Sequence, residues 1–160
     1  SKTGKQTGRT IEIQRLIGRS LRSITNLDLL NGHQVIIDCD VLQADGGTRT
    51  ASISGGFVAL NLAIKKFLEK KLIKKNPILD YVAAISCGIL NGEVMIDLDY
   101  LEDSKADVDA NFVITKNSGF SEVQISGEES TFSTESMMKM LEMTNLTIQE
   151  IFKKQVIAIE

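Results

Sequence analysis

The dipeptide Asn91-Gly92 lies between two apolar runs, and it constrains the fold more than any other feature. Asn-Gly favours the left-handed backbone of a two-residue hairpin turn, and the flanking runs Tyr81–Leu90 and Glu93–Asp99 have the composition of strands. The same reasoning predicts a second hairpin, which consists of Asn111–Thr115 and Phe120–Ser126 around the turn Asn117-Ser118-Gly119. The sequence therefore predicts an antiparallel sheet of at least four strands.

Segments with helical periodicity surround the hairpins. Apolar residues recur at steps of three and four in three segments, which predicts helices at about Ile11–Ile24, Thr48–Leu72 and Ser133–Ile159. Ser133 is expected to be the N-cap of the last helix. Between the first two of these helices, the β-branched run Gln34–Leu42 predicts another strand. Pro77, the only proline, is expected to close the second helix region. The order helix, strand, helix, four strands, helix favours an α+β fold, a two-layer sandwich.

The composition narrows the class of protein. The chain has 160 residues, a net charge of −3 and 42% hydrophobic residues, which suits one ordinary globular domain. The apolar runs are too short or too charged to predict a membrane span. Cys39 and Cys87 lie in apolar runs without metal-type spacing, so we expect two buried free thiols and a cytoplasmic, reducing location.

The junction Gly46-Gly47-Thr48-Arg49 precedes the second predicted helix and has two interpretations. Free backbone N–H groups and the dipole at a helix start attract anions, glycine allows close approach, and arginine binds phosphate with two hydrogen bonds. The alternative is a plain strand-to-helix turn, in which Asp45 caps the helix and Arg49 is solvated. The sequence of this stretch alone leaves both open.

Carboxylates are concentrated between residues 97 and 109, with Lys105 as the single basic residue among them. Clustered carboxylates raise one another's pKa unless a cation neutralises them, and Mg²⁺ or Mn²⁺ takes such oxygen ligands. The alternative is a solvated acidic loop, and the spacing does not match an EF-hand. The acidic residues are Asp97, Asp99, Glu102, Asp103, Asp107 and Asp109.

The N-terminal part of the chain is basic. Arg15, Arg19 and Arg22 recur at helical steps and predict a basic stripe that follows RNA or a subunit interface, or that is simply solvated. Gly8-Arg9, before the first predicted helix, offers a second arginine for the same anion. An anion pocket, an acidic metal pocket and a basic stripe are together the parts that a reaction at a phosphodiester needs.

Four stretches of the sequence closely resemble ribonuclease PH, the phosphorolytic 3′→5′ exoribonuclease related to polynucleotide phosphorylase and the exosome ring subunits. They are GRTIEIQRLIGRSLRS, IDCDVLQADGGTRTASISGGFVAL, AAISCGILNGEVMIDLDYLEDSKADVDANFV and EVQISGE. The resemblance runs from about Gly8 to Gln155. It implies the ribonuclease PH type of β-α-β sandwich (ribosomal-protein-S-five-like), present here as a single domain over residues 1–160 that forms the C-terminal two-thirds of the family fold.

The resemblance also implies an activity. Inorganic phosphate would attack the terminal phosphodiester of tRNA or rRNA precursors and release nucleoside diphosphates, reversibly. Phosphate binding is implied for Arg9, Gly47, Thr48 and Arg49. Catalysis with a bound Mg²⁺ or Mn²⁺ is implied for Asp103 and Asp109, with Asp97 as a weaker supporting ligand. A non-catalytic RNA-binding or ring-scaffold subunit is the alternative.

The resemblance also sets expectations for partners. The family assembles as a hexameric ring of dimers, which the helix with Arg15, Arg19 and Arg22 could serve. The chain begins where a full-length member would be well advanced, so we expect a separate N-terminal segment to supply the first strands of the sheet and a tRNA-gripping loop. Thr7 stands where a glycine is expected, a change that leaves Arg9 in place.

Overall fold

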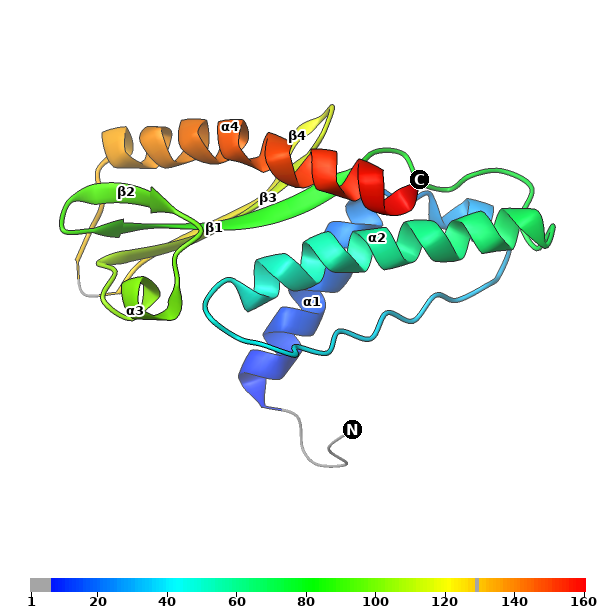
Figure 1. Ribbon diagram of the computed structural model, residues 1–160, viewed down its shortest axis with the longest axis horizontal. Helices are drawn as coiled ribbons and strands as arrows, with labels where there is room; N and C mark the ends of the chain where they lie inside the picture. Colours follow the sequence, from blue (N-terminus) through cyan, green and yellow to red (C-terminus); the bar gives the residue numbers. More distant parts are fainter. Residues whose placement is uncertain (1–6, 129) are drawn as a thin grey trace.

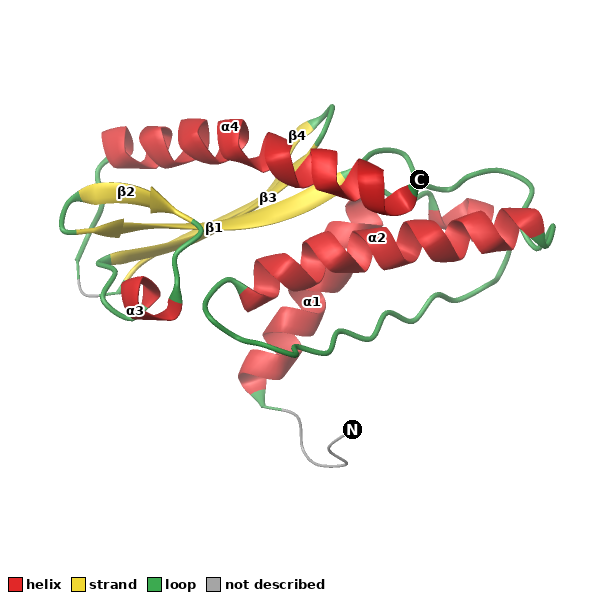
Figure 2. Ribbon diagram, in the orientation of Figure 1, coloured by secondary structure: helices red, strands yellow, loops and turns green. Residues whose placement is uncertain are grey.

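A computed structural model describes residues 7–128 and 130–160. It has a mixed α+β fold in which a twisted sheet lies against long helices (Figure 1). In chain order the elements are α1 (Gly8–Ser23), a short 3-10 helix η1 (Leu27–Leu30), α2 (Thr48–Glu69), β1 (Val82–Leu90), β2 (Glu93–Ile96), α3 (Tyr100–Asp103), β3 (Val108–Thr115), β4 (Gly119–Gly127) and α4 (Thr134–Ile159). Two of the long helices, α2 and α4, extend alongside the sheet (Figure 2).

The sheet is antiparallel with the strand order β2-β1-β3-β4. Both predicted hairpins are confirmed: Leu90 pairs with Glu93 across Asn91-Gly92, and Thr115 pairs with Gly119. Asn91 has a φ of 52°, the left-handed conformation that this turn requires. The hairpin signals in the sequence therefore identified both hairpins, and the pairing of β1 with β3 joins them into one sheet.

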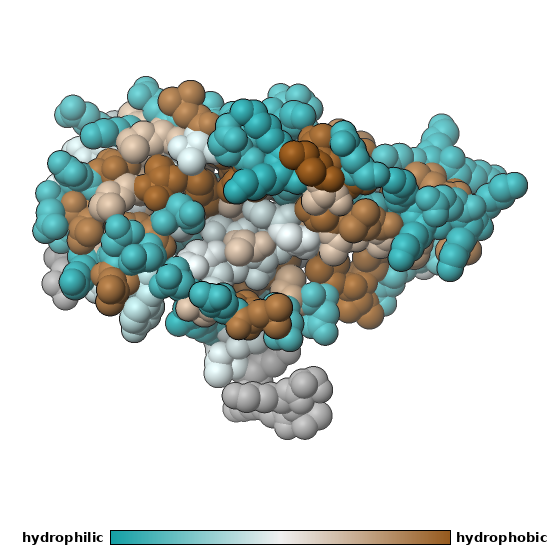
Figure 3. Space-filling view, viewed as in Figure 1, coloured by the Kyte–Doolittle hydropathy of each residue, from teal (hydrophilic) through white to brown (hydrophobic). Residues whose placement is uncertain are grey.

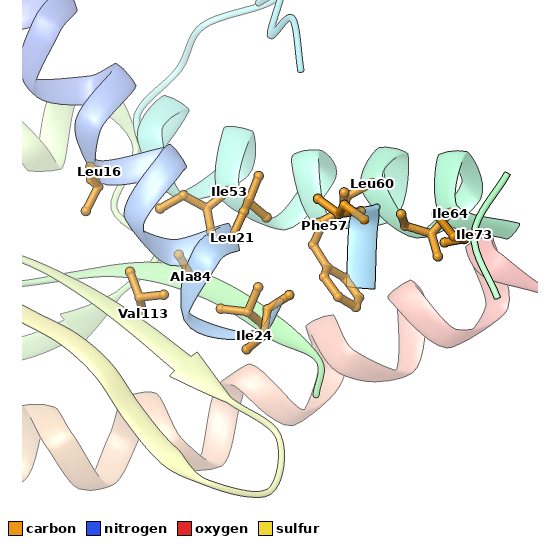
Figure 4. Packing of buried hydrophobic residues seen from close by; sticks show 12 residues of the cluster. Leu16, Leu21, Ile24, Ile53, Phe57, Leu60, Ile64, Ile73, Ala84 and Val113 are labelled. Atoms are coloured by element: carbon orange, nitrogen blue, oxygen red, sulfur yellow. The ribbon is translucent and has the colours of Figure 1, made fainter. Parts of the chain in front are cut away.

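Alternate residues of β1 face two separate cores. Val82 and Ala84 pack with α1 and α2, in the cluster that Figure 4 shows around Phe57. Ala83, Ile85, Cys87 and Ile89 pack with α4 on the opposite face. Because side chains alternate along a strand, one continuous apolar run can fill both cores. The sheet is thus covered by helices on both faces, and β1 is its most buried strand.

The helix termini follow ordinary capping chemistry. Ser133 caps α4, as predicted, because its hydroxyl accepts a hydrogen bond from Ser136 N–H at 3.0 Å. Thr7 caps α1 in the same way through Thr10 N–H. Within the described residues, α2 is the one helix long and apolar enough to cross a membrane by length and composition. The core helix of a soluble protein passes the same test. The side chains of Ile53, Phe57 and Ile64 on α2 are buried in the core that also contains Val82 and Ala84.

The predicted strand Gln34–Leu42 is wrong. The segment is extended and runs alongside α2 (Figure 1), but no backbone-to-backbone hydrogen bond joins residues 34–46 to any described residue. We call residues 34–46 the unpaired segment. Ile37 lies against α2, whereas Ile36 is 82% exposed and Leu42 94% exposed. The β-branched composition produced an extended backbone, but the described chain supplies no strand beside it.

This difference also corrects the prediction for one cysteine. Cys87 is fully buried in β1, as expected, but Cys39 is exposed because it lies on the unpaired segment.

The space-filling view in Figure 3 shows apolar side chains at the surface on the face seen in Figure 1.

Candidate active site

The glycine loop, residues 45–49, leads into α2 and has a backbone that needs glycine. Gly46 and Gly47 have φ values of 84° and 58°. A Cβ on Gly46 would collide with the carbonyl oxygen of Leu98, so the loop packs directly on the backbone that follows β2. Gly47 is the N-cap of α2 and supplies no side-chain hydrogen bond. The amide groups at the start of α2 are therefore uncapped and suit an anion.

Asp45 does not cap α2, so the plain capped-turn interpretation of the loop is wrong. Its carboxylate instead accepts a hydrogen bond from the N–H of Tyr100 at 3.3 Å. This contact joins the glycine loop to α3, which carries part of the acidic segment. Two segments more than fifty positions apart in the sequence are thereby held together.

Arg49 connects the glycine loop to the acidic residues. The pKa of Asp109 is raised, first by burial and then by the negative charge of Asp103, while the positive charge of Arg49 opposes the rise. Glu128 adds a smaller negative contribution. Asp109 and Arg49 are both half-buried, so their charges are less screened than on an open surface. The charges of Asp103 and Arg49 therefore both act on Asp109, in opposite directions.

Two other carboxylates of the acidic segment have a structural role. Asp99 accepts a hydrogen bond from Glu102 N–H at 2.9 Å, and Glu102 accepts one from Asp99 N–H at 3.0 Å. This reciprocal arrangement is a capping box for α3. Because α3 ends at Asp103, the box fixes the position from which that carboxylate projects.

Asp97 lies at the glycine loop. It has a φ of 59°, and a Cβ on Gly47 would lie 3.7 Å from one of its carboxylate oxygens. It is not among the charges that shift the pKa of Asp109. The structure therefore places Asp97 beside the glycine loop, and the charge of Asp103 near Asp109.

The carboxylates of the acidic segment supply only some of the ligands that a hard divalent cation needs. Among residues 7–128 and 130–160, no three His, Cys, Asp or Glu side chains converge as a metal site. Mg²⁺, however, commonly binds one or two carboxylates together with substrate phosphates and water. The mutual repulsion that raises the pKa of Asp109 is what such a cation would relieve. Asp103 and Asp109 are the residues that could hold it.

The arginines of α1 are divided between two surfaces. Arg19 forms a two-pronged ion pair with Glu122 of β4, at 2.8 and 2.7 Å. Arg22 lines a groove of about 1000 Å³ between α1, α2 and the unpaired segment, which Thr48 and Arg49 also line. Arg15 lies with Arg19 beside β4. The stripe is therefore not one continuous free basic surface.

Arg9 is exposed in the first turn of α1. Its neighbour Thr10 lines the same groove as Thr48 and Arg49. The structure thus brings the start of α1 to the same groove as the start of α2.

Two site residues were missed by the sequence analysis. Ser86 of β1 lies under the glycine loop, where a Cβ on Gly47 would be 3.6 Å from its hydroxyl oxygen. Glu128 follows β4 and acts on Asp109. Both lie in stretches that resemble the family, but no local pattern marks either of them as a site residue. The antiparallel register brings Glu128 to the site, since it pairs Val108 with Gly127 and so fixes the end of β4 beside Asp109.

Comparison with known proteins places the chain in a known family. The model described as 3′ exoribonuclease family, domain 1, matches residues 1–65, and the model for domain 2 of the same family matches residues 80–145. The two matches together cover most of the chain. They include Arg9, the glycine loop and the carboxylate pair.

Solved structures share the fold. The crystal structure of rice (Oryza sativa) Rrp46 has a TM-score of 0.71 and 21% identity, over 99% of this chain and 69% of the rice chain. An Archaeoglobus fulgidus exosome with RNA bound to the active site has a TM-score of 0.68 and 17% identity, over 96% of this chain and 64% of that one. An archaeal exosome core has a TM-score of 0.68 and 18% identity, over 92% of this chain.

The chain therefore spans roughly two thirds of the rice chain and slightly less of the archaeal ones, for which the covered shares are 64% and 63%. At these identities the structural likeness concerns the fold, and the family models add the sequence relationship. The chain belongs to the 3′ exoribonuclease family of ribonuclease PH.

Proposed function

We propose that this chain carries the active site of a phosphate-dependent 3′→5′ exoribonuclease. The observation that carries the proposal is the position of Arg49, which belongs to the uncapped start of α2 and whose charge acts on Asp109. An anion at the helix start would thus lie next to two carboxylates that repel each other. A hydrolytic nuclease would need the carboxylates but not the anion site.

The proposed reaction is an in-line displacement. Phosphate bound by Thr48, Arg49 and the amide groups of α2 attacks the phosphorus of the last phosphodiester. The bond to the 3′ oxygen of the preceding nucleotide breaks, that oxygen takes a proton from the attacking hydrogen phosphate, and a nucleoside diphosphate leaves. Mg²⁺ or Mn²⁺ held by Asp103 and Asp109 would neutralise charge on the transferring group. The Arg49 guanidinium screens the repulsion between the two phosphates.

Further parts of the proposal concern substrate and assembly. We propose the 3′ ends of tRNA precursors as the substrate, a homo-hexameric ring as the assembly, and the cytoplasm as the location. A separate N-terminal segment would supply strands for the unpaired segment, whose backbone groups have no partner in the described chain. Family membership supports these proposals.

The test uses an RNA with a single-stranded 3′ tail, Mg²⁺ and inorganic phosphate. We expect shortening that requires phosphate and yields nucleoside diphosphates, as measured by chromatography of the products. Arg49→Ala should raise the KM for phosphate far more than the Kd for RNA. Trimming that proceeds without phosphate and releases nucleoside monophosphates would contradict the proposal.

A ring-scaffold or RNA-binding subunit without activity is the second candidate, favoured by the unpaired segment and its exposed apolar residues. Asp103→Asn separates the two functions. In the enzyme, the rate should fall by about 100-fold or more while RNA binding is kept. Asp107→Asn removes the same charge from an exposed neighbour and is the matched control. If Asp103→Asn changes no RNA-dependent property, the scaffold function is favoured.

A further inference from the structure

Ser86 is a buried polar residue with an unused hydroxyl group. The residue is 5% exposed, and its Oγ atom has no hydrogen-bond partner among the described residues. Buried hydroxyl groups are nearly always paired, because an unpaired one loses its hydrogen bonds to water without compensation. An unpaired hydroxyl therefore calls for an explanation.

The direction of this side chain is set by the strand. Ser86 shares the face of β1 that carries Val82 and Ala84, which pack against α1 and α2. At Ser86 this face meets the glycine loop. The hydroxyl oxygen of Ser86 lies 3.6 Å from the position that a Cβ on Gly47 would occupy. Gly47 has no side chain to stand between this hydroxyl and the uncapped start of α2, and Thr50 Oγ1 and a carboxylate oxygen of Asp97 lie within 4 Å of the same point.

The neighbouring hydroxyl groups show that pairing is easy at this interface. Ser54 of α2 contacts the same strand and bonds to the backbone N–H and carbonyl of Ala84, at 3.0 and 3.3 Å. Thr50 donates to the carbonyl of Gly47 at 2.8 Å. Each of these hydroxyl groups finds a backbone partner, whereas that of Ser86 points at the loop and finds none.

We propose that Ser86 is a further ligand of the phosphate that the start of α2 binds, so that its hydroxyl donates a hydrogen bond to a phosphate oxygen. The inference rests on the proposed function and adds a fourth group to Thr48, Arg49 and the backbone amides. A neutral donor on a rigid strand binds the anion without adding charge beside Asp109.

The experiment compares Ser86→Ala with Ser54→Ala in the full chain. Initial rates are measured against inorganic phosphate at fixed RNA and Mg²⁺, and melting temperatures are measured with and without phosphate. Ser86→Ala should raise the KM for phosphate by about 10- to 100-fold, the loss expected for a hydrogen bond to a charged group. It should also reduce the rise in Tm that phosphate causes.

The control should behave in the opposite way. Ser54→Ala should lower the Tm, because it removes paired hydrogen bonds, and should leave the KM for phosphate unchanged. Ser86→Cys keeps a weak donor of similar size and should give an intermediate KM. It serves as the second variant should the alanine form fail to fold.

The outcomes separate the two claims. If the unmodified chain requires phosphate but both Ser86 variants keep its KM and its Tm shift, the role of Ser86 is wrong and the proposed function stands. If the unmodified chain neither uses phosphate nor is stabilised by it, both are wrong.

Discussion

Among single residues, Gly46 is the position where the glycine loop tolerates least change. Its φ of 84° is unfavourable for any other residue, and a Cβ would collide with the backbone at Leu98 and Asp99. Gly46→Ala should therefore lower the free energy of unfolding by at least about 1–3 kcal/mol, as measured by urea denaturation.

Gly55→Ala is the matched control for this substitution. Gly55 is exposed within α2, and a Cβ there would meet nothing within 4 Å. Alanine is the better helix former, so Gly55→Ala should raise stability by up to about 1 kcal/mol. If both variants were equally stable, the packing of Gly46 on the backbone after β2 would be wrong.

The residues of the site differ in how far the sequence could identify them. A local motif singles out Thr48 and Arg49, whereas Asp103 and Asp109 are singled out within the acidic segment by the family resemblance, and the roles of all four stay predictions. Asp45 was expected as a possible cap, but its carboxylate is drawn to the N–H of Tyr100, a contact that depends on tertiary structure. Ser86 was not identified as a site residue, because a serine in an apolar strand has no distinctive local pattern. Its position under the glycine loop depends on tertiary structure.

At the level of elements, Gln155 joins α4 to both α2 and β1. Its amide nitrogen donates to the carbonyls of Ser54 and Val82 at 3.0 and 2.9 Å, and the residue is 3% exposed. Gln155→Ala leaves these buried carbonyls without that donor and should cost about 1–3 kcal/mol of unfolding free energy. Thermal denaturation followed by circular dichroism measures this loss.

The control lies on the same helix. Gln149 is exposed on α4, so Gln149→Ala should change stability by less than about 0.5 kcal/mol. An unchanged melting temperature for Gln155→Ala would show that α4 is held by its apolar contacts alone.

The element predictions succeeded where the signal is local. Asn91-Gly92 sets its own turn, and Ser133 satisfies its own helix start, so both were read correctly. The strand Gln34–Leu42 failed for the converse reason. β-branched residues favour an extended backbone, but a strand also needs a neighbour, and residues 7–128 and 130–160 place none beside it.

For the whole molecule, the two helix-covered faces of the sheet and the unpaired segment should differ sharply in hydrogen exchange. Amides of β1 and β3 are bonded and buried, so they should exchange slowly. Amides of residues 34–46 should exchange within seconds, as measured by mass spectrometry. Slow exchange there at all protein concentrations would contradict the unpaired state, and slow exchange only at high concentration would indicate pairing between copies.

The location of the two thiols offers a practical consequence. Burial raises the pKa of Cys87 to about 12, so it stays protonated and inert towards alkylating reagents near neutral pH. Cys39 is exposed on the unpaired segment. A maleimide dye should therefore attach at a single position without any engineering. Its emission would report directly on whether another strand has docked beside the label.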